Sequence, residues 1–139
     1  MKEQMLHAFA EAHEKLLITA KKVVTRGAAP AETWGPQEIL AHITAWESEA
    51  FQRIPLLATG ASDKTYDADL FNAGAVAAIG DRSFEQIERE LSQTHQRLID
   101  LLEAQEERAF APGGYAQEWI TASIRHSLEH AQEFEKVGS

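Results

Sequence analysis

Apolar residues recur at three- and four-residue steps along four stretches of the chain, a spacing that predicts four amphipathic helices. The stretches cover residues 2 to about 24, 36 to about 58, 84 to 102 and 117 to 137. Gly27 and Pro30 end the first stretch, Pro36 suits the first turn of the second, and Ser83 with Gln86 predicts an N-cap for the third. Residues 108–116, which contain a Pro-Gly-Gly sequence, are predicted to form a loop.

The link between the second and third predicted helices is unusually long for a turn in a helical bundle. It extends from Gly60 to Arg82 and includes an apolar piece, residues 70–79, that we expect to form a short helix. A link of this kind can return along the bundle, so the two helices it joins would run parallel. Because no segment is strand-like, we predict an all-α four-helix bundle with up-down-down-up topology, in a single domain over residues 1–139.

Composition narrows the classes of function. The 139 residues are 44% hydrophobic and 25% charged, as in an ordinary soluble domain, and no run is long enough to form a membrane helix. A net charge of −9 disfavours nucleic acid and anionic membranes as partners. The chain has no cysteine, so a transition metal would have to be held by imidazole and carboxylate groups. The opening residues contain no secretion signal, and we expect a cytoplasmic protein.

Three histidines interrupt otherwise apolar helix faces. His42 lies in the second predicted helix, and His126 and His130 lie one turn apart in the fourth. A buried imidazole without a partner costs a few kcal/mol of desolvation. Two explanations remain open on the residues alone: each ring hydrogen-bonds a core carbonyl or carboxylate, or the three rings converge on one metal ion and leave a position for water or substrate.

Other polar residues near these faces are weaker candidates for catalysis. Glu49 and Glu133 each lie close in sequence to a histidine of the set and are candidates for a general base, and His95 borders the core of the third helix. The ordinary alternative is that the two glutamates are solvated and that His95 is a hydrogen-bonded, half-buried side chain. His7 and His13 are assigned to a helix surface or boundary, without a role.

Two segments resemble a known family. Residues 34–47, WGPQEILAHITAWE, resemble the second-helix signature of the DinB-like (YfiT-like) superfamily, and residues 126–130, HSLEH, are similar to its fourth-helix His-x-x-x-His motif. Residues 66–72 and 82–87 are similar to the DfsB and ClbS branch of this superfamily. Ser127 departs from that branch, in which an aromatic residue often follows the first of the paired histidines. The resemblance implies an up-down-down-up bundle, a homodimer, and a divalent metal, often nickel, zinc or iron, bound by His42, His126 and His130.

The resemblance also implies the kind of reaction. A metal-dependent enzyme of this family would act on a small molecule, either as a hydrolase or as a transferase that uses a low-molecular-weight thiol. Because the chain has no cysteine, that thiol would come from a cosubstrate. The alternatives are a non-catalytic module that sequesters a small molecule or serves a stress response, and a purely structural bundle that dimerises through an apolar face.

Overall fold

Helix ends fall where the capping residues predict them in the computed structural model, which describes residues 1–27 and 34–138. Gly27 ends the first helix with a φ of 68°, in the left-handed region that glycine adopts readily. Ser83 and Gln86 form the predicted capping box, in which each side chain accepts a hydrogen bond from the other's backbone N–H. Pro30 lies outside the described residues.

The described residues contain α-helices and one short 3₁₀ helix, and no strand among them, which confirms the all-α prediction. The elements are α1 (Lys2–Arg26), α2 (Pro36–Ala58), α3 (Ala68–Ala77), α4 (Phe84–Glu103), η1 (Glu107–Phe110) and α5 (Gln117–Gly138). The short helix begins earlier than expected because Asp67 caps it, accepting a hydrogen bond from the backbone N–H of Leu70. The predicted loop of residues 108–116 overlaps η1, whose four residues give no helical periodicity to detect.

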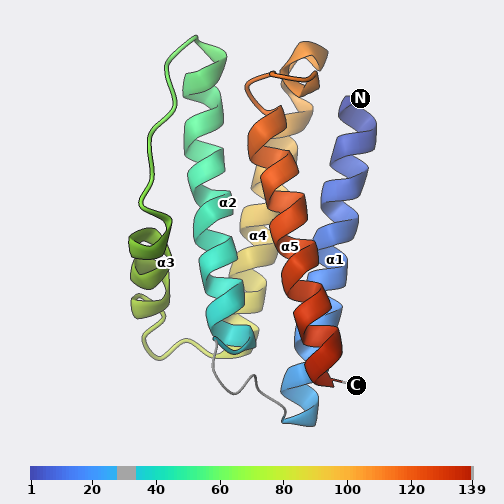
Figure 1. The fold of residues 1–139 in the computed structure, drawn as a ribbon, viewed down its shortest axis with the longest axis vertical. Coiled ribbons are helices and arrows are strands. Elements are labelled where there is room, and N and C mark those ends of the chain that lie inside the picture. The colour runs from blue at the N-terminus through green and yellow to red at the C-terminus, as the bar shows by residue number, and fades with distance from the viewer. Residues whose placement is uncertain (28–33, 139) are drawn as a thin grey trace.

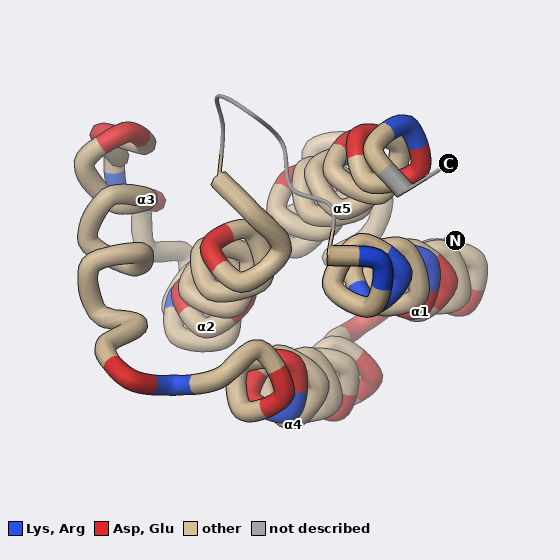
Figure 2. The backbone as a smooth tube through the Cα atoms, turned by 90° about the horizontal axis from the view of Figure 1, so that it is seen from below, with Lys and Arg blue, Asp and Glu red and all other residues tan. Residues whose placement is uncertain are grey.

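Four long helices lie side by side, with α3 outside them against α2 (Figures 1 and 2). In Figure 1 the chain runs downward in α1, upward in α2 and α4, and downward in α5. α1 packs mainly against α5, and α2 mainly against α4. An extended segment, residues 61–67, returns from the upper end of α2 towards α3, so α2 and α4 begin at the same end of the molecule.

The buried side chains form two apolar clusters. One contains Leu16, Ala20, Val23, Ile39, Leu40, Ala41, Ile43, Ile79, Phe84, Ile87, Leu91 and Phe134. The other contains Phe9, Ala50, Ile54, Leu98, Leu102, Ala109, Phe110, Ala116 and Ile120.

Polar side chains occupy the layer between these clusters. His13 falls between the clusters along α1, Glu47 along α2, His95 along α4, and His126 with His130 along α5. Burial of such groups is costly unless each finds a partner, so this polar layer is the part of the core that apolar packing alone does not explain. No helix within the described ranges is both long enough and apolar enough to cross a bilayer.

Candidate metal centre

Three imidazole rings from two helices converge at one edge of the polar layer. His42 comes from α2, and the four-residue step on α5 places His126 and His130 on the same helix face. The Nε2 atom of His126 lies 3.0 Å from Nε2 of His42 and 3.0 Å from Nε2 of His130. All three candidate ligands are therefore brought together.

The contacts among these Nε2 atoms are not those of an ordinary hydrogen-bonded core. A ring nitrogen carries either one proton or one lone pair, so Nε2 of His126 cannot make two good hydrogen bonds at once. Adjacent ligands bound to one metal ion at about 2.0–2.1 Å lie about 2.8–3.4 Å from one another in octahedral or tetrahedral geometry. The nitrogen spacing fits a three-imidazole set around a shared cation.

The Nδ1 atoms of two of these rings face oxygen atoms. Nδ1 of His42 lies 3.4 Å from the carbonyl oxygen of Glu38, to which its N–H donates, and this leaves the lone pair on Nε2. Nδ1 of His130 lies 3.3 Å from Oε1 of Glu133. That distance is within ion-pair range, but Nδ1 has no hydrogen bond of good geometry, so the carboxylate is a neighbour rather than a fixed partner.

Burial keeps the three rings neutral at pH 7. It lowers the pKa of His42 to about 4, with a further contribution from the charge of His126. It lowers the pKa of His130 to about 3, helped by the charges of His126 and His42, and it also lowers the pKa of His126. Neutral imidazoles are the form that binds a metal ion, so the site is ready to ligate without losing protons.

A pocket of about 420 Å³ opens beside His126. Its lining contains Trp46, Ala68, Asn72, Trp119, Ala122, Ser123, Arg125, His126 and Glu129. The indole N–H of Trp46 donates to Oδ1 of Asn72 at 2.7 Å, and that of Trp119 donates to Oδ2 of Asp63 at 2.7 Å. The crossover between α2 and α4 is thereby attached to the aromatic wall of the pocket.

The predicted catalytic candidates fall in three different places. Glu133 is the one that contacts a histidine of the converging set. Glu49 accepts a hydrogen bond from the hydroxyl of Tyr66 at 2.6 Å and lies 3.7 Å from Nζ of Lys64, which ties the crossover to α2. His95 is buried against Glu47, away from these contacts. A catalytic role for any of the three stays a prediction.

Sequence reasoning did not single out the charged residues of the pocket or two members of the polar layer. Arg125 and Glu129 line the pocket together with His126, and their exposed positions on α5 gave no signal. Glu47 follows Ile43 by four residues and precedes Ala50 by three. This spacing puts it on the core-facing side of α2, and that pattern could have identified Glu47 as a buried residue. His13 is half-buried and stacks on His95, whereas His7 is exposed beside Glu11.

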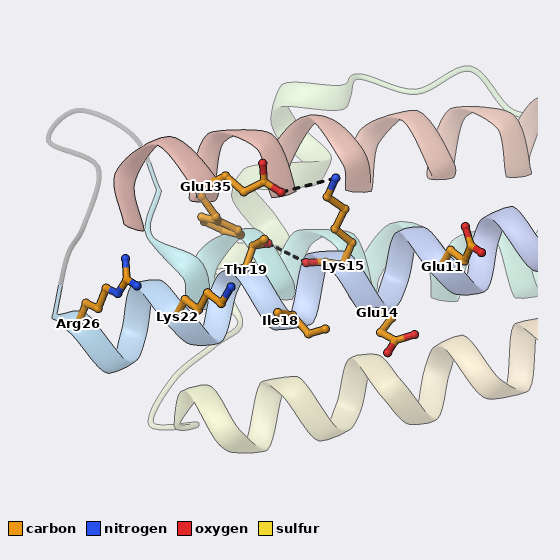
Figure 3. A pocket seen from close by; sticks show the side chains of 9 residues that line it. Glu11, Glu14, Lys15, Ile18, Thr19, Lys22, Arg26 and Glu135 are labelled. Atoms are coloured by element: carbon orange, nitrogen blue, oxygen red, sulfur yellow. Dashed lines mark hydrogen bonds and ion pairs between the residues drawn. The ribbon is translucent and has the colours of Figure 1, made fainter. Parts of the chain in front are cut away.

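A larger groove of about 610 Å³ lies along α1 and α5, away from the converging histidines (Figure 3). Its polar lining carries both signs of charge, and Nζ of Lys15 lies 3.5 Å from Oε1 of Glu135. Ile18 and Phe134 supply its apolar surface. The groove contains none of the candidate site residues.

A comparison with known protein families gave a match over most of the chain. A family model described as the DinB superfamily matches residues 3–135. This chain belongs to the DinB superfamily. The superfamily prediction is thereby confirmed, whereas the DfsB and ClbS branch stays a prediction. Neither the curated proteins nor the solved structures gave a match for this DinB superfamily member.

Proposed function

We propose that this DinB superfamily protein is a metal-dependent enzyme that acts on a small molecule in the pocket beside His126. The observation that carries the proposal is the approach of the Nε2 atoms of His42 and His130 to that of His126, each at 3.0 Å. His126 also lines the pocket, so a ligand there would lie next to the ion.

The donor set suits a divalent transition metal. Three neutral imidazoles are acceptable ligands for nickel, zinc or iron, and no thiolate is present in the chain to favour a softer ion. When bound, the ion supplies Lewis acidity, which either acidifies a water molecule or binds the thiolate of a cosubstrate. His42, His126 and His130 would hold the ion, with the carboxylate of Glu133 beside the ring of His130.

The side chains that line the pocket have separate roles in this proposal. Trp46 and Trp119 provide flat apolar surface for the body of the substrate, and Arg125 provides a positive charge in the lining. Glu129 lines the same pocket and is the carboxylate we assign to accept a proton from a bound nucleophile. This arrangement is compatible with a hydrolase and with a low-molecular-weight-thiol transferase.

The decisive experiment measures metal content and activity together. Protein purified from its native host is analysed for nickel, zinc and iron, then assayed on small esters and amides, and on electrophiles with and without a thiol cosubstrate. Product formation that needs the thiol identifies a transferase, and formation without it identifies a hydrolase. His126→Ala should abolish activity and metal binding by the three converging histidines, whereas His7→Ala, which removes an exposed histidine, should change neither.

The aromatic pocket also favours a second candidate function, a binding module that sequesters a small molecule without reaction. That alternative predicts that ligand binding survives in His126→Ala, with no turnover in the wild type.

We further propose that the protein belongs to the DfsB and ClbS branch and is a cytoplasmic homodimer. We also propose that its bundle has up-down-down-up topology, which the helix directions in Figure 1 support. Light scattering in solution tests the dimer.

A further inference from the structure

A second group of metal-ligating side chains lies within the same polar layer. His13 comes from α1, Glu47 from α2 and His95 from α4, so this group involves none of the three converging histidines. One potential ligand atom from each residue lies within 4.8 Å of those of the other two. The group therefore joins three helices at the level where the two apolar clusters meet.

Glu47 is the most unusual member because its carboxyl group lies in the core. Its side chain is 2% exposed, and Oε1 lies 2.9 Å from Nδ1 of His95. Burial raises the pKa of Glu47, while the hydrogen bond and the charge of His95 oppose that rise. One imidazole is a modest partner for a carboxylate buried this deeply, because ionised carboxylates in protein interiors usually gain several hydrogen bonds or a metal ion.

Two ring nitrogens in this group have no hydrogen-bond partner. They are Nε2 of His95 and Nδ1 of His13, and both atoms are buried. The side chain of His95 is 7% exposed, so water does not readily satisfy it. Unpaired buried polar atoms are rare in folded proteins and call for a bound ion, a bound molecule or a functional role.

We propose that His13, Glu47 and His95 form a second site for a divalent transition metal. The two imidazoles and one carboxylate are a donor set that suits zinc, iron and manganese. A cation there would neutralise the buried carboxylate, replace its hydrogen bond with Nδ1 of His95, and give Nδ1 of His13 the partner that the protein does not supply. The 2.9 Å separation of Oε1 and Nδ1 is also close to that of adjacent ligands on one ion.

Binding requires one change in the positions of the rings. The rings of His13 and His95 are stacked, with centroids 3.9 Å apart and planes 7° from parallel, so one ion cannot lie in both ring planes. His13 is the ring that turns, because it is half-buried and its contact with Oγ of Ser92 is long, at 3.5 Å. His95 is held between Glu47 and the ring of Phe9.

The two groups differ in a way that an experiment can separate. The converging histidines are neutral and lie beside a pocket, whereas the second group contains a carboxylate and lies between α1, α2 and α4. Loss of one group therefore leaves the ligands of the other intact. Failure of the second site is distinguishable from failure of the proposed function.

The test counts bound zinc in the full-length protein after dialysis against a weak chelator. The wild type should retain two equivalents, His126→Ala one, Glu47→Gln one, and the double variant none. His7→Ala is the matched control for surface binding, because His7 also lies beside a carboxylate, 2.6 Å from Glu11, but is exposed; it should retain two. One equivalent in the wild type, lost entirely in His126→Ala and unchanged in Glu47→Gln, would overturn the proposal.

A second measurement keeps the proposal testable if Glu47→Gln does not fold. Zinc is added to the folded His126→Ala protein while the imidazole nitrogens are followed by NMR. The nitrogens of His13 and His95 should shift with a stoichiometry of one, and His13→Gln in the same background should remove the response. If neither ring responds to zinc, the proposal fails, and the group is a hydrogen-bonded part of the core.

Discussion

The two histidine groups share one polar layer but differ in composition and access. His42, His126 and His130 bring three Nε2 atoms together without a carboxylate between them, and His126 reaches a pocket. His13 and His95 instead share their space with Glu47, whose side chain is almost fully buried. In our proposals the first group serves chemistry on an outside molecule, and the second serves metal binding or stability inside the bundle.

This difference shows that buried histidines have to be interpreted by the atoms that their nitrogens face. Convergence of ring nitrogens without donors between them favours a shared cation, because no arrangement of protons satisfies all of them. For a histidine that faces a carboxylate, one hydrogen bond satisfies one ring nitrogen, and only the other nitrogen still needs a partner. Removal of single side chains from each group tests whether the two groups differ in this way.

The largest effect is expected for His126→Ala. The Nε2 atom of His126 lies 3.0 Å from both of the other Nε2 atoms in the first group. Mutation of a residue that only hydrogen-bonds to a metal ligand can lower metal affinity by roughly 100-fold, so removal of His126 itself should lower it by more. Competition with a coloured chelator measures the change. His7→Ala should bind as the wild type does, and an unchanged affinity in His126→Ala would show that these rings do not hold the ion.

Removal of the carboxylate of the second group should mainly affect stability. Glu47→Ala leaves His95 without its partner and opens a cavity, and we expect the metal-free protein to lose about 3 kcal/mol of unfolding free energy. Urea denaturation followed by circular dichroism provides the measurement. Glu11→Ala, at an exposed position, should stay within about 0.5 kcal/mol of the wild type. A similarly small loss for Glu47→Ala would contradict the role given to this pair.

Acid should destabilise the metal-free protein through the histidines of both groups, whereas the raised pKa of Glu47 acts in the opposite direction. Burial lowers the folded-state pKa of His13 to about 3, of His42 to about 4 and of His130 to about 3, whereas the unfolded value is about 6.5. The unfolded chain therefore binds more protons below pH 6.5, so stability is fully present above that pH and is lost as the pH falls from there through the folded values.

The size of this effect is moderate, since water screens the partly exposed rings. Between pH 7 and 5.5 we expect a loss of up to about 1 kcal/mol per histidine, seen as a lower Tm in thermal unfolding. A variant that carries His13→Phe should lose less stability than the wild type over the same pH interval. A Tm that is constant or that rises on acidification would contradict the pKa directions.

The smallest effect is expected for Glu133→Gln. Because Oε1 lies 3.3 Å from Nδ1 of His130 and the carboxylate is half-exposed, we expect about a tenfold loss of metal affinity, at the lower end for such outer partners. Chelator competition again measures it. Glu135→Gln is the control, because Glu135 pairs with Lys15 on the groove side of α5. Equal affinities for both variants would remove Glu133 from the centre.

Much of the fold follows from the sequence because its signals are local. Apolar residues at helical spacing predict the four long helices, and the capping residues Gly27 and Ser83 predict two of their ends. The three candidate ligands could also be found from the sequence, since His42, His126 and His130 replace apolar residues on core-facing lines. Their convergence itself depends on how α2 meets α5, which no local pattern specifies.

The parts that sequence reasoning missed depend on contacts between distant segments. Glu47 is one of 22 acidic residues, most of which must be solvated, so its burial is visible only once α1, α2 and α4 are placed around it. His13 was assigned to a surface or boundary because its stacking partner, His95, lies on another helix. The pocket wall depends on an extended segment that carries Asp63, whose partner, Trp119, is on α5.

The most direct test of the account is a crystal structure of the metal-loaded protein, with anomalous diffraction recorded at the absorption edge of the ion. We predict a strong anomalous peak between α2 and α5, about 2.0–2.1 Å from the Nε2 atoms of His42, His126 and His130. The absence of a peak among these three nitrogens in protein that has been supplied with nickel, zinc or iron would contradict the central claim.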